Sequence, residues 1–378
     1  MAAPIKTAVA SATSGFVPRA VFEVSSSITR SYFLGHHASA LTSMRKVLSN
    51  ISLILECRDS RVPLTSTNPL LETELAGRER IIVYTKSSLC APASASRWVQ
   101  EQKQLLTKFH SARLGSGVGE GEAGRTQVVF TDERNARSIK QLIDIIKERA
   151  AAADSLTGLR ALVVGMPNAG KSTLLNALRS VGMQKPKAAR TGAEPGVTRS
   201  LSTPVRVIPE DMAAGIDAGV FVVDTPGVFV PYVADLEAML KLALVGCVKD
   251  GLVPAETVAD YLLFRLNLRD PKSYSEFSAP TNDVRDFLDA IALRTGKLVK
   301  GGVPSQEQAA DWIVQQWRKG NLGRFGLDEV SKESLGAWSA KALAGEEAQP
   351  LSMSQAKKRE KEARKERYAA RRKAAEGA

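Results

Sequence analysis

Cysteine is scarce in this chain of 378 residues, and long apolar runs are absent. The three cysteines, Cys57, Cys90 and Cys247, lie far apart and show no C-x-x-C spacing. This pattern excludes a disulfide framework and a cysteine-rich zinc site, and it favours a reducing compartment. No apolar stretch approaches the roughly 20 residues that a membrane-spanning helix needs. The sequence therefore predicts a protein without a transmembrane span.

Length and charge set further bounds. The chain has room for about two domains, and an apolar content of 44% suits a globular protein with a sizeable core. The net charge of +12 is concentrated at the ends, with +4 in residues 1–50 and +6 in residues 354–378. The intervening chain is nearly balanced, which indicates basic arms rather than a basic globule.

The first thirty residues are rich in Ala, Ser, Thr and Val, and their bases (Lys6, Arg19, Arg30) outnumber the single acid, Glu23. No compact apolar region with an A-x-A cleavage site is present, which argues against a secretory signal. Few acids, many hydroxyls and scattered bases are typical of an organellar transit segment. We therefore predict a transit segment over residues 1–30, with an ordinary disordered terminus as the alternative.

The strongest local signal is the stretch LRALVVGMPNAGKST at residues 159–173. It predicts an apolar strand, a glycine-containing loop and a helix in succession. The loop matches the sequence motif G-x-x-x-x-G-K-S of a phosphate-binding loop. Successive backbone N–H groups in such a loop form an anion nest at a helix N-terminus. Lys171 is expected to reach the β- and γ-phosphates, and the Ser172 hydroxyl to ligate Mg²⁺. The predicted nucleotide-binding residues of this loop are Asn168, Ala169, Gly170, Lys171, Ser172 and Thr173.

Two downstream motifs fit a bound nucleoside triphosphate. Asp224 ends a predicted strand and begins D-T-P-G, so it is placed to hold Mg²⁺, while the backbone N–H of Gly227 can meet a γ-phosphate. Thr198 lies between the two motifs in a polar loop, where a hydroxyl can complete the Mg²⁺ shell and take part in catalysis. A plain turn is the alternative for each motif.

Apolar periodicity predicts alternating strands and helices as far as Val223, the pattern of a mostly parallel α/β sheet. The glycine-rich residues 111–125 read as a surface loop. After Pro231 only helices are expected, and Ser305 with Gln308 forms a capping box at the start of one of them. We predict an α/β nucleotide-binding domain over residues 31–230, a helical domain over 231–350 and a basic tail over 351–378.

Taken together, the phosphate loop, Thr198 and D-T-P-G resemble a Ras-like GTPase. Such proteins also carry an N-K-x-D guanine clamp, and nothing like it follows Gly227. A candidate clamp lies upstream instead, at Thr85, Lys86 and Ser88, so the motif order is permuted. Several short sequence motifs of the chain resemble those of the circularly permuted ribosome-assembly GTPases of the YlqF/RbgA family. They are FLGHH (33–37), CRDSRVPLTSTNP (57–69), GMPNAGKST, PGVT, DTPG, LALVGCVKDG (242–251) and LVKGGV (298–303).

With its transit-like N-terminus, the chain resembles a mitochondrial member of that family. The resemblance covers about residues 31–330 and implies a Ras-like α/β domain in permuted order, followed by an all-α domain that docks on RNA. It implies GTP hydrolysis with Mg²⁺ in the service of large-subunit assembly on the mitochondrial ribosome, in the matrix or peripheral to the inner membrane. The basic tail is expected to contact ribosomal RNA, with anionic lipid of the inner membrane as the alternative.

The resemblance also implies three residue roles. The family's histidine corresponds to His36, which is expected to orient or activate the attacking water, although the adjacent His37 complicates the assignment. Val228 occupies the place where Ras-like proteins keep a catalytic glutamine. Asn168 matches a phosphate-loop asparagine that helps bind K⁺ in potassium-dependent relatives.

The clamp departs from the family pattern, because Thr85 replaces Asn and Ser88 replaces Asp. A hydroxyl cannot offer guanine the two acceptors of a carboxylate, and the lost charge-assisted bonds cost about 1.5–3 kcal/mol. Guanine preference is therefore expected to be weakened, while the stem of Lys86 still covers the base. A nucleotide-tolerant RNA- or ribosome-binding factor with little hydrolysis is the alternative function.

Overall fold

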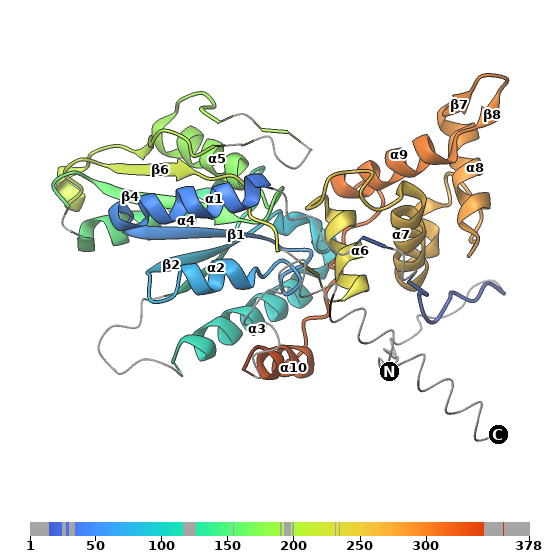
Figure 1. Cartoon of the computed structure of the whole chain (residues 1–378), viewed down its shortest axis with the longest axis horizontal. Coiled ribbons are helices and arrows are strands. Elements are labelled where there is room, and N and C mark those ends of the chain that lie inside the picture. The colour runs from blue at the N-terminus through green and yellow to red at the C-terminus, as the bar shows by residue number, and fades with distance from the viewer. Residues whose placement is uncertain are drawn as a thin grey trace.

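A computed structural model gives the fold of the chain. It describes residues 15–24, 28–29, 35–115, 126–153, 155–189, 191–192, 198, 200–230, 232–233, 235–343 and 358. Figure 1 shows an α/β part and a helical part lying side by side, with α6 (Leu236–Val245) between them. Within the described residues, no helix is both long and apolar enough to cross a membrane.

The α/β part is built on a six-stranded sheet with the strand order β3-β2-β1-β4-β6-β5. Neighbouring strands pair in parallel, except that β5 runs antiparallel to β6. This confirms the mostly parallel sheet expected from the sequence. Its strands are β1 (Leu53–Asp59), β2 (Arg80–Thr85), β3 (Gln127–Phe130), β4 (Leu159–Gly165), β5 (Val205–Ile208) and β6 (Val220–Asp224).

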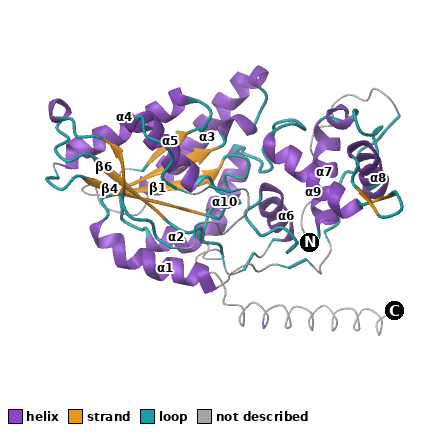
Figure 2. Cartoon of the chain, turned by 90° about the horizontal axis from the view of Figure 1, so that it is seen from above, coloured by secondary structure: helices purple, strands orange, loops and turns teal. Residues whose placement is uncertain are grey.

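Helices cover both faces of this sheet (Figure 2). Because successive strand side chains point to opposite faces, Leu53 and Leu55 pack with α4 and α5, whereas Ile54 packs with α1 and α2. Ile82 and Tyr84 of β2 pack against α3. The helices of this part are α1 (Gly35–Val47), α2 (Pro69–Glu74), α3 (Ser96–Gly115), α4 (Ala136–Ala153) and α5 (Lys171–Met183), with short 3₁₀ turns η1 (Leu48–Asn50), η2 (Ser87–Leu89), η3 (Ala93–Ala95) and η4 (Met212–Ala214).

The strand order explains how a permuted chain forms one site. The phosphate-loop strand β4 is late in the chain but lies between β1 and β6 in the sheet. Because β1, β2, β4 and β6 are parallel, their carboxyl ends meet at one edge, the usual place for a ligand in an open α/β sheet. The predicted clamp, phosphate loop and D-T-P-G motif follow β2, β4 and β6 respectively, so all three lie at that edge.

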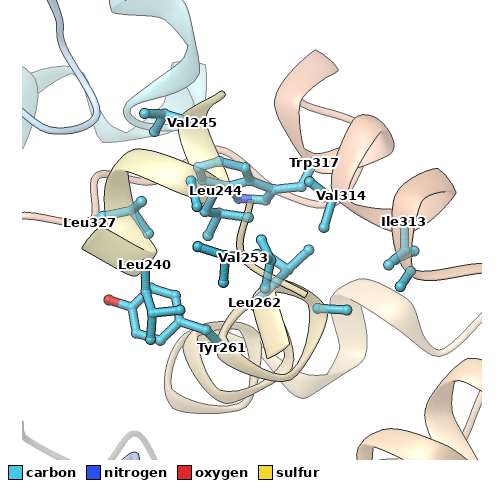
Figure 3. Close-up of a cluster of buried hydrophobic side chains, with 14 of the residues drawn as sticks. Leu240, Leu244, Val245, Val253, Tyr261, Leu262, Ile313, Val314, Trp317 and Leu327 are labelled. Atoms are coloured by element: carbon cyan, nitrogen blue, oxygen red, sulfur yellow. The ribbon is translucent and has the colours of Figure 1, made fainter. Parts of the chain in front are cut away.

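The helical part packs around one apolar core. Figure 3 shows residues of α6, α7 and α9, together with Val253 and Leu327, pointing toward one another; Trp317 lies among them and is 2% exposed. Three helices of the helical part begin at a capping side chain and end at a left-handed glycine. These glycines are Gly246 for α6, Gly296 for α8 and Gly320 for α9. The helices are α6 (Leu236–Val245), α7 (Ala255–Arg269), α8 (Val284–Thr295), α9 (Gln306–Lys319) and α10 (Lys332–Leu343), with the 3₁₀ turn η5 (Pro271–Tyr274). The predicted start of α9 is confirmed, since Ser305 accepts a bond from the Gln308 nitrogen at 3.4 Å.

Some expectations were wrong. The region after Pro231 is not purely helical, because β7 (Leu298–Val299) and β8 (Val303–Pro304) form a small antiparallel hairpin around a glycine turn. Helix α10 packs Leu335 and Trp338 against α3 rather than against the other late helices. The predicted loop 111–125 begins later, because α3 continues through good helix formers to Gly115; residues 116–125 lie outside the described part.

The segment 15–24, which falls within the predicted transit segment, lies against the helical part. Arg19 pairs with Asp260 of α7 through a 2.5 Å contact, and its backbone nitrogen donates to Asn282 Oδ1 at 3.3 Å. The ring of Phe22 meets the ring of Tyr261 edge-on, with centroids 5.3 Å apart. Ile28 is also buried in the core of the helical part. This segment therefore has specific partners in the folded chain.

Candidate functional site

A cavity of about 290 Å³ opens at the carboxyl edge of the sheet. Its walls come from the phosphate loop, the segment after β2, the segment after β3 and helix α9. A volume near the lower end of the range for ligand pockets still suits a partly open nucleotide site. Of the predicted site residues, those lining it are Lys86, Ser88, Asn168, Gly170, Lys171, Ser172, Thr173, Thr198 and Gly227.

The phosphate loop has the backbone geometry of an anion nest. Asn168 (φ 54°) and Gly170 (φ 87°) are both left-handed, and α5 begins directly after them at Lys171. This alternation aims successive N–H groups at one point at the helix N-terminus. Lys171 is buried, and its Nζ donates to the carbonyl of Met166 at 2.8 Å. Burial lowers the pKa of Lys171, so an anion at the loop would restore the preference of this amine for its charged form.

The D-T-P-G segment passes close to the phosphate loop. A Cβ added to Gly227 would lie 2.5 Å from the Cα of Pro167, so only glycine allows this approach. The Val228 nitrogen donates to the carbonyl of Gly165 at 3.1 Å, which joins the two segments through the backbone. Val228 itself is buried at 2% exposure. Its side chain therefore lies in the core instead of reaching toward the phosphates.

Three oxygen ligands expected for Mg²⁺ lie together. Ser172 Oγ lies 2.5 Å from Asp224 Oδ2 and 3.1 Å from Thr198 Oγ1. Asp224 Oδ1 is buried, with no hydrogen-bond partner among the described residues. Burial raises the pKa of Asp224, and the hydrogen bond from Ser172 opposes that rise. Two hydroxyls, a carboxylate and a buried acceptor without a partner form a donor set that fits Mg²⁺.

The predicted clamp residues have two different positions. The Thr85 hydroxyl is buried and donates to the carbonyl of Ala169 at 2.8 Å, so it holds the phosphate loop instead of facing a base. Lys86 has a left-handed backbone (φ 55°), and its Nζ donates to Asn168 O at 2.7 Å and to Asp59 Oδ2 at 2.8 Å. Its stem then lines the cavity. Ala169 is buried behind the loop.

The sequence did not single out Asp59 and Arg61, which lie beneath the clamp. Asp59 is fully buried and pairs with Arg61 and with Lys86, each at 2.8 Å. Burial by itself raises the pKa of Asp59, but the charges of Arg61 and Lys86 outweigh that effect and hold it well below its usual value. The Arg61 guanidinium also lies 4.8 Å from the ring centroid of Trp317 in α9. This cluster therefore connects the clamp with the helical part.

A second connection involves the C-terminus of α6. The Arg318 guanidinium donates to the carbonyls of Ala243 (2.8 Å) and Leu244 (2.9 Å), and it pairs with Asp250. Cations at helix C-termini are favoured because the last carbonyls lack helical partners. Arg318 also lines the cavity. The helical part thus supplies one wall of the site.

The histidine pair is described only in part. His36 lies in the first turn of α1, and its side chain is outside the described part of the structure. His37 is 1% exposed, and its Nδ1 lies 2.8 Å from the carbonyl oxygen of Gly227. His37 therefore holds the D-T-P-G segment against α1. The role expected of His36 stays a prediction.

Two further cavity residues, Glu133 and Arg134, were not identified from the sequence. They follow β3, which pairs with β2. They lie near the clamp only because β3 is the neighbour of β2 in the sheet, so no local sequence motif identifies them.

Known proteins resemble this chain over most of its length. Residues 160–289 match the family described as 50S ribosome-binding GTPase. Mitochondrial GTPase 1 of Schizosaccharomyces pombe is 38% identical over 325 residues, which cover 85% of this chain and 95% of the relative. Mitochondrial ribosome-associated GTPase 1 of Xenopus tropicalis is 33% identical over 316 residues, covering 79% and 94%. The crystal structure of GNP-bound YlqF from T. maritima aligns with a TM-score of 0.47 at 20% identity, covering 78% of this chain and 99% of that one.

The identities to the curated relatives extend through both the α/β part and the helical part, and they confirm the family that the motifs indicated. The chain belongs to the mitochondrial GTPase 1 family.

Proposed function

We propose that this protein binds GTP with Mg²⁺ at the cavity, hydrolyses it to GDP and phosphate, and thereby assists assembly of the large mitochondrial ribosomal subunit. The observation that carries the nucleotide site is the meeting of Ser172, Thr198 and Asp224 beside the phosphate loop. These residues come from three separate segments, and the fold brings their oxygens together. Such convergence is what a triphosphate–Mg²⁺ site requires.

Each part of the site has a distinct task in this proposal. The loop N–H groups and Lys171 bind the β- and γ-phosphates, and the Gly227 N–H meets the γ-phosphate. Ser172, Thr198 and Asp224 would hold Mg²⁺, which offsets the charge that develops on the phosphates when it is bound. The remaining wall from α9 limits access of water to the site.

Water activation is assigned to His36, because Val228 is buried and has no polar group to offer. GTP turnover measured with purified large-subunit particles tests this role. His36→Ala is expected to lower the stimulated turnover about 10²- to 10⁴-fold, whereas Thr42→Ala on the exposed face of α1 should leave it unchanged. Equal stimulated turnover in the His36 variant would remove His36 from the mechanism.

The ribosomal partner is supported by the names of the relatives, one of which is a mitochondrial ribosome-associated GTPase. The helical part is proposed to dock on ribosomal RNA, since it borders the nucleotide cavity through Val245, Gln315, Arg318 and Lys319. Sedimentation of the protein with mitochondrial large-subunit precursors tests this. A non-hydrolysable GTP analogue should increase co-sedimentation over GDP; equal binding in both states would contradict a GTP-dependent assembly factor.

The location is proposed to be the mitochondrial matrix, reached through a targeting segment within residues 1–30. The basic tail is proposed to contact ribosomal RNA phosphates, so deleting residues 354–378 should reduce the salt dependence of particle binding. Peripheral contact with the inner membrane is the competing role of the tail. Co-sedimentation with vesicles containing anionic lipid distinguishes the two.

The nucleotide-tolerant alternative makes a different prediction for base choice. Parallel titrations with fluorescent GTP and ATP analogues distinguish it from the GTPase. Equal affinities would contradict guanine selectivity, even though the phosphate site is intact.

A further inference from the structure

The cavity contains one carboxylate at the end where the base should lie. Among the described residues that line it, Glu133 is the only acidic one. Ser88, the residue in place of the clamp aspartate, also lines the cavity and offers only a hydroxyl. The chemistry that Ser88 has lost therefore has one candidate replacement in the same wall.

The strand order brings Glu133 close to the clamp. β2 and β3 pair in parallel with Tyr84 opposite Phe130, so the segments that follow them leave the sheet side by side. A backbone bond joins these segments, since the Ser87 nitrogen donates to the carbonyl of Thr131 at 3.1 Å. Glu133 and Ser88 are thus held at adjacent positions on the same edge.

The segment after β3 is also fixed internally. Asp132 Oδ1 accepts a 2.9 Å bond from the Arg134 nitrogen, and the Asp132 carbonyl accepts one from the Asn135 nitrogen at 2.9 Å. Asp132 therefore accepts hydrogen bonds within its own turn. Glu133 makes no hydrogen bond or ion pair with any part of the chain that the structure describes, so its carboxylate stays available to a ligand.

We propose that Glu133 supplies the carboxylate that reads guanine, in place of Ser88. A carboxylate accepts hydrogen bonds from guanine N1–H and from its exocyclic amine, and adenine offers no N1–H donor. The base would then lie over the stem of Lys86, between the segments that follow β2 and β3. This inference rests on the proposed nucleotide site and names its determinant of base specificity.

Competition of unlabelled nucleotides against a fluorescent GDP analogue on the full chain tests the proposal. The wild type should bind GDP about tenfold more tightly than IDP, which lacks the exocyclic amine, and more tightly still than ADP. Glu133→Gln should weaken the binding of GDP about ten- to a hundredfold. The same variant should raise the affinity for XDP relative to the affinity for GDP. An amide can donate a hydrogen bond to the xanthine 2-oxygen, whereas a carboxylate repels this oxygen.

Two further variants make the outcome decisive. Glu148→Gln, an exposed carboxylate outside the cavity, should leave every affinity unchanged. Adding Ser88→Asp to Glu133→Gln should restore GDP affinity and the preference over XDP, which loss of folding would not allow. An unchanged GDP-to-XDP ratio in Glu133→Gln, or equal GDP and IDP affinities in the wild type, would overturn the assignment of Glu133. Failure to bind any guanine or adenine nucleotide would instead overturn the nucleotide site itself.

Discussion

The side-chain amide of Asn168 donates a 2.7 Å hydrogen bond to the carbonyl oxygen of Gly246. Asn168 belongs to the phosphate loop, and Gly246 is the left-handed residue that ends α6. This bond joins the nucleotide site directly to the helical part. Since the same turn of α6 is held by Arg318, a shift of the phosphate loop is expected to be felt at this helix.

Replacing Asn168 tests this connection and the proposed K⁺ site together. Asn168 is also the residue that the family resemblance implies as a K⁺ ligand, and an amide oxygen is the type of atom that can bind such a cation. Asn168→Ala should abolish any acceleration of GTP turnover by K⁺ over Na⁺ and lower stability by about 1 kcal/mol. Turnover in the two salts and urea unfolding measure these effects. Asn321→Ala, at an exposed position of the helical part, is the matched control; retention of a K⁺ response in Asn168→Ala would exclude Asn168 as its ligand.

The proposed Mg²⁺ ligand Asp224 can be tested through metal removal. Asp224→Asn keeps the shape and removes the charge, so GTP turnover should fall more than a hundredfold, in line with the several kcal/mol that a bound metal supplies. In the wild type, EDTA should weaken GTP binding, and in the variant EDTA should have little further effect. Asp217→Asn, an exposed acid outside the site, should behave as wild type. A normal EDTA response in Asp224→Asn would show that the metal is held elsewhere.

Asp59 connects acid stability with the clamp. Its pKa is lowered in the folded state by Arg61 and Lys86. The stabilisation is therefore present above its unfolded pKa of about 3.9 and is lost as pH falls below it. Asp59→Asn leaves the buried Arg61 and the half-buried Lys86 without their shared anion, which costs about 3–5 kcal/mol at pH 7.

Urea unfolding of wild type and Asp59→Asn at pH 7 and near pH 4 checks this prediction. The difference in unfolding free energy should begin to shrink near pH 4, because the unfolded wild type takes up a proton at Asp59 there while the folded protein keeps this carboxylate charged. A difference that grew toward low pH would contradict the assigned direction of the shift.

The N-terminal segment offers a test of where targeting ends and folding begins. Because residues 15–24 contact α7 and Ile28 is buried, the chain that lacks only residues 1–14 keeps these contacts, and its melting temperature serves as the reference. Deleting residues 1–28 should lower it by several degrees, about what a loss of 1–2 kcal/mol produces. Arg19→Ala should account for about 1 kcal/mol, while Arg97→Ala in an exposed surface pair should have no effect. Equal melting temperatures for both truncations would show that the segment does not contribute to stability.

Local patterns predicted much of the fold because they depend on neighbouring residues alone. Apolar periodicity predicted the alternation of strands and helices, and the Ser305 capping box predicted where α9 begins. The exceptions lie where another part of the chain intervenes. α10 packs on α3 instead of joining the other late helices, and β1 buries Glu56 and Arg58 as an ion pair.

The site divides in the same way. The sequence by itself determined the family and the residues of the phosphate loop, since that loop is contiguous and its glycines and lysine are dictated by phosphate geometry. Only the tertiary structure brought Thr198 and Asp224 onto Ser172, joined Asn168 to Gly246 and put Glu133 beside Ser88. These relationships depend on which strands are neighbours in the sheet. Strand order is set by packing over the whole chain and not by any local sequence motif.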